Sequence, residues 1–451
     1  MDQAVIRGLA THLTGSLLCP GDDQYDEART IWNAMIDKRP AAIARCKTTS
    51  DVVASVNFAR EHDLLVSVRG GGHNVAGNAV CDDGLMIDLS LMNRVTIDPG
   101  KQRVNVQGGC TLGDVDRATD EHGLAVPAGI VSETGVGGLA LGGGVGWLVR
   151  KYGMTCDNLL SAEVVTADGK VVSASGSENS DLYWALRGGG GNFGVVTNFE
   201  FQAHPVKDVI AGMIIHPREA ARDVYRFYRD FTKTAPLELT AYCAMLSLPD
   251  GTPVTAVIAC YCGTQAESES VLKPLREFGQ PIADMLAPMP RLELQTMFDA
   301  GFPYGNRNYW KSTFLEELTD DAIDTLVDHG NRVPSPLSAT MIEYYYGGPS
   351  SEIGETETAF SHREAQYDLG VVGQWVDAAD DQLNIQWVRD TYDALEPYGN
   401  GRIYANLMGA EQMEQESQLR AAFGVNYDRL VEVKRKYDPK NFFRLNQNIK
   451  P

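Results

Sequence analysis

Hydrophobic and polar positions in the first half of the chain follow helical and strand periods in turn. Apolar residues recur at helical spacing in Ser50–His62, with Ser50-Asp51 as the expected N-cap. A short apolar run, Leu64–Val68, follows at once and predicts a strand. We therefore expect this half to be built from short strands joined by helices.

The same alternation continues along the chain. Two more strands are predicted at Leu85–Leu89 and Arg103–Gln107, separated by the turn Asp98-Pro99-Gly100. Leu112–His122 has the spacing of a helix, and Ala162–Ala174 has that of a hairpin with a glycine in its turn.

The residue pattern changes after about Pro205, where clusters of glycine no longer occur. Strand-like runs such as Val254–Tyr261 and Ser338–Tyr346 then stand between helical stretches, and tyrosine and tryptophan become frequent. A chain of 451 residues is too long for one ordinary core. We expect an α+β protein with domains at 1–205 and 206–401, and a C-terminal segment, 402–451, that returns to the first domain.

Charge and composition exclude several classes of function. The formal net charge is −21, so nucleic acid and anionic lipid would be repelled. No stretch approaches the roughly 18 apolar residues that span a bilayer, and the first residues lack the apolar core of a signal peptide. We expect a cytoplasmic protein without a membrane partner. The cysteines have no metal-binding spacing, so no metal site is expected.

Three glycine-rich segments stand in the first half: Arg69–Asn74, Thr134–Gly146 and Gly188–Gly194. Glycine lets successive backbone N–H groups point at one anion, so three such segments favour dinucleotide binding. The third also matches G-x-G-x-x-G, but Leu182–Leu186 before it has the pattern of a helix end. A nicotinamide site needs a strand there, so that cofactor is disfavoured.

An ordered series of motifs resembles the berberine-bridge-enzyme-like branch of the vanillyl-alcohol-oxidase superfamily, and within it the bacterial hydroxynicotine-oxidase type. The resemblance covers nearly the whole chain. It rests on Ser67–Gly77, Gly135–Gly144, Arg150–Gly153, Asp157-Asn158, Arg187–Gly190, Asn192–Val196, Tyr437–Asn441, Asn446 and Asn448. It implies a two-domain PCMH-type FAD-binding fold, with a substrate domain on a mostly antiparallel sheet flanked by helices.

The resemblance also implies a covalent bond between His73 and the 8α-methyl carbon of FAD. Many relatives add a second bond from a cysteine, but Val131 stands at that place here, so a single linkage is expected. Cys156 lies outside the pattern and is expected to be a packed thiol. The expected cofactor-binding residues are Arg69, Gly70, Gly71, Gly72, His73, Asn74, Gly77, Thr134, Gly137, Gly138, Gly142, Gly146, Asn158, Val195, Val196, Asn446 and Asn448.

The catalytic base departs from the family pattern. Leu407 occupies the place of a tyrosine that acts as base in plant-type relatives, and the position of a glutamate or glutamine in other relatives, in the strand after His362-Arg363, falls near Val371. The expected substitutes are Glu343, Tyr345 and Asn406. On a strand, Glu343 and Tyr345 would share one face, although ordinary sheet packing explains both residues equally well.

The resemblance implies an oxidase that removes a hydride from a C–OH or C–N carbon of a small molecule and reduces dioxygen to hydrogen peroxide. One alternative is a flavin dehydrogenase that uses another electron acceptor. A second alternative, from a different class, is a flavin-binding protein that has lost its catalytic base.

Overall fold

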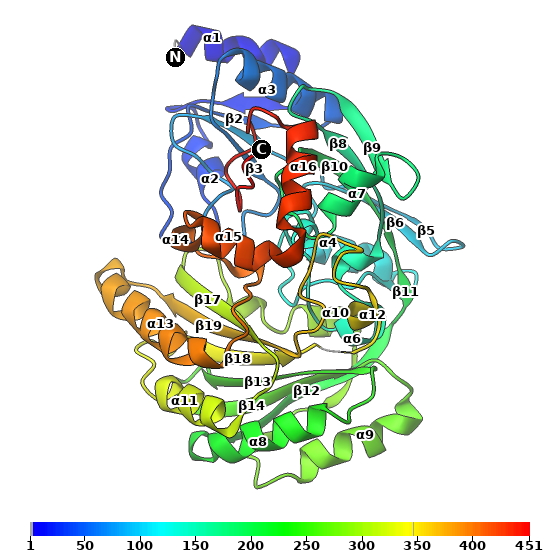
Figure 1. Cartoon of the computed structure of the whole chain (residues 1–451), viewed down its shortest axis with the longest axis vertical. Helices are drawn as coiled ribbons and strands as arrows, with labels where there is room; N and C mark the ends of the chain where they lie inside the picture. The colour runs from blue at the N-terminus through cyan, green and yellow to red at the C-terminus, as the bar shows by residue number, and fades with distance from the viewer. Residues whose placement is uncertain (1–2, 346) are drawn as a thin grey trace.

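The structure is a computed structural model that describes residues 3–345 and 347–451. It has two parts (Figure 1). The first contains two smaller sheets from the N-terminal half of the chain, together with the C-terminal helices and tail. The second is a large sheet with helices on one of its faces.

The first sheet positions the first glycine segment, Arg69–Asn74. Its strand order is β1 (Ser16–Leu18), β2 (Ala42–Arg45), β4 (Leu85–Asp88) and β3 (Val66–Arg69). β2, β4 and β3 are parallel, so Arg69 and Asp88 end neighbouring strands in register. The Arg69 guanidinium binds the Asp88 carboxylate at 2.8 Å, which fixes the point where the glycine loop leaves the sheet.

The second sheet is antiparallel throughout and packs below the first. Its order is β5 (Val95–Asp98), β6 (Arg103–Gln107), β10 (Val195–Gln202), β8 (Leu159–Val165) and β9 (Val171–Ser175). The expected hairpin is the pair β8 and β9. The turn at residues 98–100 joins β5 to β6. β5 was not predicted from the sequence, because Val95–Asp98 is half-buried and too short to show a clear alternation of apolar and polar residues. A small pair, β7 (Leu124–Ala125) and β11 (His204–Pro205), lies beside this sheet.

The large sheet is built from the middle of the chain, and its strands pair antiparallel. The order is β15 (Ala283–Asp284), β12 (Asp208–Pro217), β14 (Pro253–Tyr261), β13 (Leu239–Ser247), β18 (Ala339–Tyr344), β19 (Tyr367–Trp375) and β17 (Arg307–Leu315), with β16 (Ala287–Pro290) also on β12. Helices α8, α9, α11 and α13 cover one face, and the other face points toward the first part (Figure 1).

The helices are mostly short. They are α1 (Gln3–Gly8), α2 (Tyr25–Arg29), α3 (Thr49–Glu61), α4 (Leu112–Asp120), α5 (Val136–Leu141), α6 (Val149–Tyr152), α7 (Ser180–Leu186), α8 (Ala221–Thr232), α9 (Gln265–Glu277), α10 (Arg291–Gln295), α11 (Asp320–Gly330), α12 (Pro349–Glu352), α13 (Asp381–Leu395), α14 (Ala410–Met413), α15 (Glu416–Phe423) and α16 (Tyr427–Tyr437). The N-cap of α3 is Thr48, not Ser50-Asp51, because Thr48 and Asp51 form a reciprocal capping box.

The C-terminal segment is held against the first part by a buried ion pair. Lys434 of α16 binds Asp438 at 2.7 Å, and both side chains are 0% exposed. The same ammonium donates to the backbone oxygens of Asn192 and Phe443 at 2.7 and 2.9 Å. Every proton of this buried cation therefore has an acceptor, which makes the pair costly to break. It fixes the tail beside the third glycine segment.

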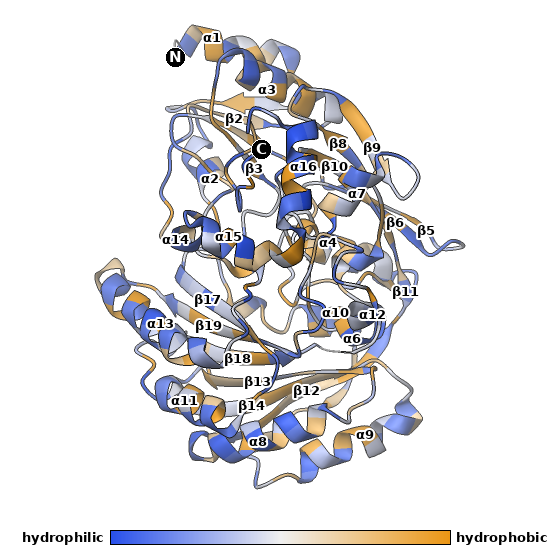
Figure 2. Ribbon diagram, viewed as in Figure 1, coloured by the Kyte–Doolittle hydropathy of each residue, from blue (hydrophilic) through white to orange (hydrophobic). Residues whose placement is uncertain are grey.

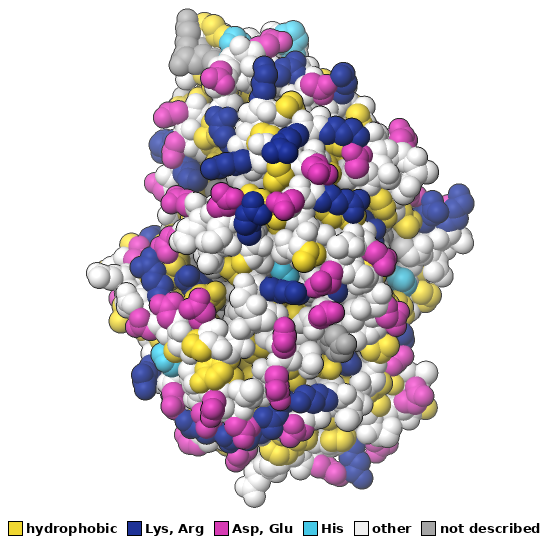
Figure 3. All heavy atoms as spheres, viewed as in Figure 1, with side chains coloured by type: hydrophobic (Ala, Val, Ile, Leu, Met, Phe, Trp, Pro, Cys, Tyr) yellow, Lys and Arg dark blue, Asp and Glu magenta, His cyan; other side chains and the backbone are white. Residues whose placement is uncertain are grey.

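Hydrophilic residues lie mainly on the outer helices, and hydrophobic residues lie mainly in the strands. Figure 2 shows hydrophilic residues along the helices outside the large sheet and hydrophobic stretches in strands such as β12. Acidic and basic side chains are interspersed on the face in Figure 3, so the net charge is not gathered in one patch there. In the described part of the chain, no helix has the length and apolar character needed to cross a membrane.

Candidate active site

A cavity lies between the two parts, and its walls come from segments far apart in the sequence. The three glycine segments and the C-terminal tail form one side. The face of the large sheet that its helices leave uncovered forms another. The cavity volume is about 390 Å³, and the space continues into an opening to solvent. This volume lies within the roughly 300–1,000 Å³ that is typical of pockets for small molecules and cofactors.

The glycines form the cofactor side by letting two loops touch backbone to backbone. A Cβ on Gly71 would stand 2.4 Å from the amide nitrogen of Gly135, and a Cβ on Gly135 would stand 2.2 Å from that of Gly71. No side chain could be accommodated at either position without moving the backbone. Gly72 also has a φ of +69°, which favours glycine. The close contact leaves the loop surfaces open toward the cavity.

His73 lines this side of the cavity, and two aromatic rings pack against it. The Trp32 indole stacks on its imidazole with centroids 4.5 Å apart and an interplanar angle of 18°, and Tyr304 lies edge-on at 6.0 Å. The Nε2 atom is buried and has no hydrogen-bond partner in residues 3–345 and 347–451. Burial lowers the pKa of His73 to about 4, so the ring is neutral and nucleophilic at neutral pH.

Unpaired acceptors show that this side suits a polar cofactor. The side-chain oxygens of Asn74 and Asn446 are buried without a donor among the described residues, and both residues line the cavity. The Asn446 amide nitrogen is already used, since it donates to the backbone oxygens of Gly191 and Phe443. A buried acceptor without a donor costs about 1–3 kcal/mol. A flavin, with a polar ring edge and a hydroxylated chain, fits this set of groups.

Most residues expected to bind the cofactor lie on the cavity wall. These are Gly70, Gly71, Gly72, His73, Asn74, Thr134, Gly137, Gly138, Val195, Val196 and Asn446. Six others are placed behind it: Arg69, Gly77, Gly142, Gly146, Asn158 and Asn448.

The contacts of three of these six residues show how they support the wall. The Asn158 amide donates to the backbone oxygens of Tyr152 and Met154. A Cβ on Gly142 would stand 1.9 Å from the Asn406 side chain, and one on Gly146 would stand 2.0 Å from the Ala128 oxygen. Direct contact of the six residues with the cofactor stays a prediction.

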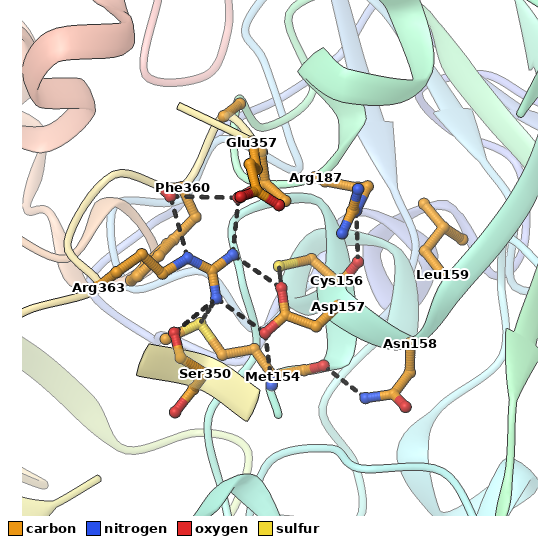
Figure 4. A network of polar contacts seen from close by, with 12 residues as sticks. Met154, Cys156, Asp157, Asn158, Leu159, Arg187, Ser350, Glu357, Phe360 and Arg363 are labelled. Carbon is orange, nitrogen blue, oxygen red and sulfur yellow. Dashed lines mark hydrogen bonds and ion pairs between the residues drawn. The ribbon is translucent and has the colours of Figure 1, made fainter. Parts of the chain in front are cut away.

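A buried network beside the second glycine segment links the two parts (Figure 4). Arg363, which precedes β19, donates to both carboxylate oxygens of Asp157 at 2.8 and 2.7 Å. The turn that carries Asp157 holds the glycine loop, because the Cys156 amide donates to the Gly143 oxygen at 2.8 Å. Cys156 is fully buried and does not line the cavity, whereas Val131 does. Burial raises the pKa of the Cys156 thiol, which keeps it protonated.

Three polar side chains form a row across the large sheet. Tyr242 of β13 pairs with Glu343 of β18, which pairs with Asp368 of β19, and all three line the cavity. Residues directly opposite in antiparallel strands share a face, with Cβ atoms about 5 Å apart. The next row, Met341 and Gly370, is apolar and small. The sheet therefore presents two neighbouring carboxyl groups to the cavity.

Both carboxyl groups are poised to hold a proton at neutral pH. Burial raises the pKa of Asp368 to about 7. Burial also raises the pKa of Glu343 well above its usual range; nearby Tyr242 opposes this shift and the charge of Asp368 adds to it. Glu343 Oε1 and Asp368 Oδ1 have no hydrogen-bond partner in the described ranges. Two interacting acids in such surroundings titrate as a pair.

Sequence reasoning missed Asp368, although a signal was present. The glutamate or glutamine position was expected near Val371, but Val371 is buried on the opposite face, against the helices. Within Tyr367–Trp375, period-two alternation puts Asp368, Gly370 and Val372 on one face, and all three line the cavity. Asp368 is the one charged residue of this mostly apolar strand, and that is the sequence signal for a functional position.

Tyr345 lies behind the cavity wall that Glu343 lines, so the two do not share a cavity face, and a catalytic role of Tyr345 stays a prediction. β18 ends at Tyr344, so the alternation does not extend to Tyr345. Its hydroxyl donates to the His362 backbone oxygen at 3.1 Å within a buried cluster, and Tyr345 is not part of the cavity wall. Tyr346, the end of the predicted run, lies outside the described residues.

Asn406 lies on the wall and organises its neighbours. Its amide nitrogen donates to the Leu139 backbone oxygen at 3.1 Å and to the Tyr404 hydroxyl at 3.0 Å. The Gly144 amide also donates to that hydroxyl, at 2.8 Å. Tyr404 and Leu407 both line the cavity. Asn406 thus joins the second glycine segment to the C-terminal segment, and Tyr404 is a cavity residue that the sequence did not single out.

Comparisons with known proteins agree with this geometry. Residues 40–175 match the family described as FAD binding domain, and residues 404–450 match that described as berberine and berberine like. An FAD-linked oxidoreductase of Dictyostelium discoideum is 32% identical over 99% of this chain and 97% of its own length. The (R)-6-hydroxynicotine oxidase of Paenarthrobacter nicotinovorans is 31% identical over 98% of each chain.

A solved structure has the same fold. The crystal structure of 6-hydroxy-D-nicotine oxidase from Arthrobacter nicotinovorans superposes with a TM-score of 0.89 and 30% identity, over 97% of this chain and 98% of that one. The expected fold class, a two-domain α+β fold of the PCMH type, is confirmed.

Proposed function

This chain belongs to the berberine-bridge-enzyme-like family of FAD-linked oxidoreductases, and we propose that it is an oxidase whose FAD is bonded once, through His73. It is an FAD-dependent oxidoreductase. The proposed division of work gives the cofactor to residues 1–205 and 402–451, and the substrate to residues 206–401. The free state of all eight cysteines suits a reducing compartment, which supports a cytoplasmic location.

The observation that carries the proposal is that one cavity holds both His73 and the carboxyl pair. The neutral imidazole is available to bond a carbon of the cofactor, and no cysteine lies on the wall to offer a second bond. Bound FAD would accept a hydride from the substrate and pass the electrons to dioxygen, which leaves as hydrogen peroxide.

The protein's own acid–base chemistry is assigned to Glu343 and Asp368. When a hydride leaves a carbon that bears a hydroxyl or amine, the O–H or N–H proton must also leave as the double bond forms. The carboxylate of the pair takes this proton. Tyr242 borders the pair, and the rest of this side is apolar or aromatic, as in Trp310 and Met341. These contacts suit a compact, mostly apolar organic molecule.

Anaerobic reduction tests the function directly. Mixing the purified yellow protein with alkaloid amines, sugars or polyketide alcohols should bleach the flavin for at least one class. Admitting oxygen should then restore the absorbance and release one hydrogen peroxide per flavin. Bleaching that persists in oxygen but ends with an artificial acceptor would identify a dehydrogenase. A flavin that no class bleaches would identify a binding protein without catalysis.

The size of the substrate space is set in part by Gly370. A Cβ at this position would meet only the Met341 backbone oxygen, at 3.9 Å, so a side chain would extend into the cavity. Gly370→Ala should be tolerated, while Gly370→Leu should weaken binding of the best substrate by about tenfold or more, since filling a pocket is costly for the ligand it fits. Flavin content and the unfolding temperature should stay unchanged. If Gly370→Leu binds and oxidises the substrate as the wild type does, the substrate must lie in another part of the cavity.

A further inference from the structure

Trp32 lies directly on the attachment histidine, and nothing in its position has so far been given a function. It stands on the loop between α2 and β2 and is 0% exposed. Its ring is nearly parallel to that of His73, at 18°, with the centroids 4.5 Å apart. Offset stacking at this distance is favourable for aromatic pairs.

Trp32 is itself tied to both parts of the molecule. Its indole Nε1 donates to the Phe302 backbone oxygen at 2.8 Å, and its backbone nitrogen donates to the Gly72 oxygen at 3.2 Å. Trp310 packs edge-on against it at 5.2 Å. The indole therefore has one orientation, fixed by the glycine loop on one side and by residues before and within β17 on the other.

The other ring near His73 is tied down in the same way. Tyr304 lies edge-on to the imidazole at 6.0 Å, and its hydroxyl donates to the Gly71 backbone oxygen at 2.6 Å. His73 thus stands between two immobilised rings, one from residues 1–205 and one from residues 206–401.

The orientation of the imidazole depends on this packing, because within the described residues the buried Nε2 atom of His73 has no hydrogen-bond partner. The torsion that rotates a histidine ring is broad, so a ring without packing or hydrogen bonds has no single orientation. Histidines that act through one nitrogen are usually oriented by a hydrogen bond to the other. In His73 the aromatic contacts take the place of that bond.

We propose that Trp32 is a positioning residue for cofactor attachment, which holds the plane of the His73 ring beside the glycine loop. This rests on the proposed covalent linkage. Attachment would replace a C–H bond of the flavin methyl group by a C–N bond, with one proton lost from the carbon, one from the imidazole, and two electrons passed through the flavin to dioxygen. Trp32 would act on this step by limiting ring rotation, not by moving a proton.

The test follows covalent flavin per polypeptide, a readout independent of turnover. Trp32→Leu keeps an apolar side chain but loses the stack, whereas Trp32→Phe keeps a flat ring. The matched control is Trp387→Leu. Trp387 is also buried, and its indole Nε1 also donates to a backbone oxygen, that of His329. Each protein is produced in cells depleted of riboflavin so that it carries no flavin, then incubated in air with excess FAD, and acid-precipitated samples are assayed for bound flavin over time.

Aromatic stacking changes populations by about two- to tenfold, so the attachment rate of Trp32→Leu should fall by about fivefold. The attachment rate of Trp32→Phe should stay within about twofold of the wild-type rate, and that of Trp387→Leu should equal the wild-type rate. Attachment in Trp32→Leu at the wild-type rate would overturn the proposal.

A second measurement separates positioning from folding. The unfolding temperature and the noncovalent affinity for FAD of Trp32→Leu should stay near wild type while covalent attachment slows. An equal loss of noncovalent FAD binding would overturn the proposal, because Trp32 would then shape the cavity and not orient the ring. Wild-type protein that lacks flavin on His73 would instead refute the covalent linkage of the proposed function.

Discussion

His73→Ala is expected to abolish covalent flavin attachment, so that acid precipitation releases all of the FAD. The glycine loops and the Asn74 and Asn446 acceptors remain in this variant, so FAD should still bind noncovalently to the folded protein. The measurement compares flavin in the pellet and the supernatant after precipitation. Absorbance before precipitation reports whether the cofactor was bound at all.

His122→Ala is the control, because His122 is exposed and lies on the turn after α4, away from the cavity wall. It should retain covalent flavin as wild type does. Covalent flavin that survives in His73→Ala would identify a different anchor and would also remove the basis for a role of Trp32.

Asp368→Asn and Glu343→Gln are each expected to slow flavin reduction by a factor of about a hundred or more, because each removes a proton acceptor that works in the transition state. Both changes preserve shape, so flavin content should not change. If the two groups share one proton, the double variant should be little slower than the slower single variant. Rapid mixing under anaerobic conditions measures these rates.

The pH dependence gives an independent signature of the pair. The pKa of Asp368 is raised to about 7 by burial, so its carboxylate form is lost below that pH and present above it. The reductive rate should therefore rise through about pH 7 and then level off, and Asp368→Asn should lack this rise. The isolated Tyr345→Phe change should leave both rate and profile near wild type, since the Tyr345 hydroxyl donates to the His362 backbone oxygen, away from the cavity wall. A hundredfold loss in Tyr345→Phe with normal rates in the carboxyl variants would reverse this assignment.

The elements with strong periodicity could be predicted from the sequence, and those set by long-range contacts could not. Arg103–Gln107 was predicted with its observed bounds as β6. By contrast, β5 is half-exposed and is a strand because it pairs with β6. α3 has Thr48 as its N-cap because Thr48 and Asp51 are three residues apart, the spacing at which each side chain bonds the other's backbone N–H. Local pattern does not reveal which of several capping residues a helix will use.

The candidate site divides in the same way. His73 and the glycine segments are recognisable because contiguous residues build that wall. The carboxyl pair could not be seen as a pair, because Glu343 and Asp368 are brought together only by the register of β18 and β19. Trp32 was not noticed for the same reason, since its contact with His73 joins loops that are far apart in sequence.

Peptide mapping of the wild-type protein tests the central claim most directly. After proteolysis, mass spectrometry should find one flavin adduct, on the peptide that contains His73, in nearly every molecule. The peptide with Cys156 should be unmodified, since that thiol is buried and does not line the cavity. A flavin on any other residue, or FAD that is wholly released from the unmodified chain, would contradict the account.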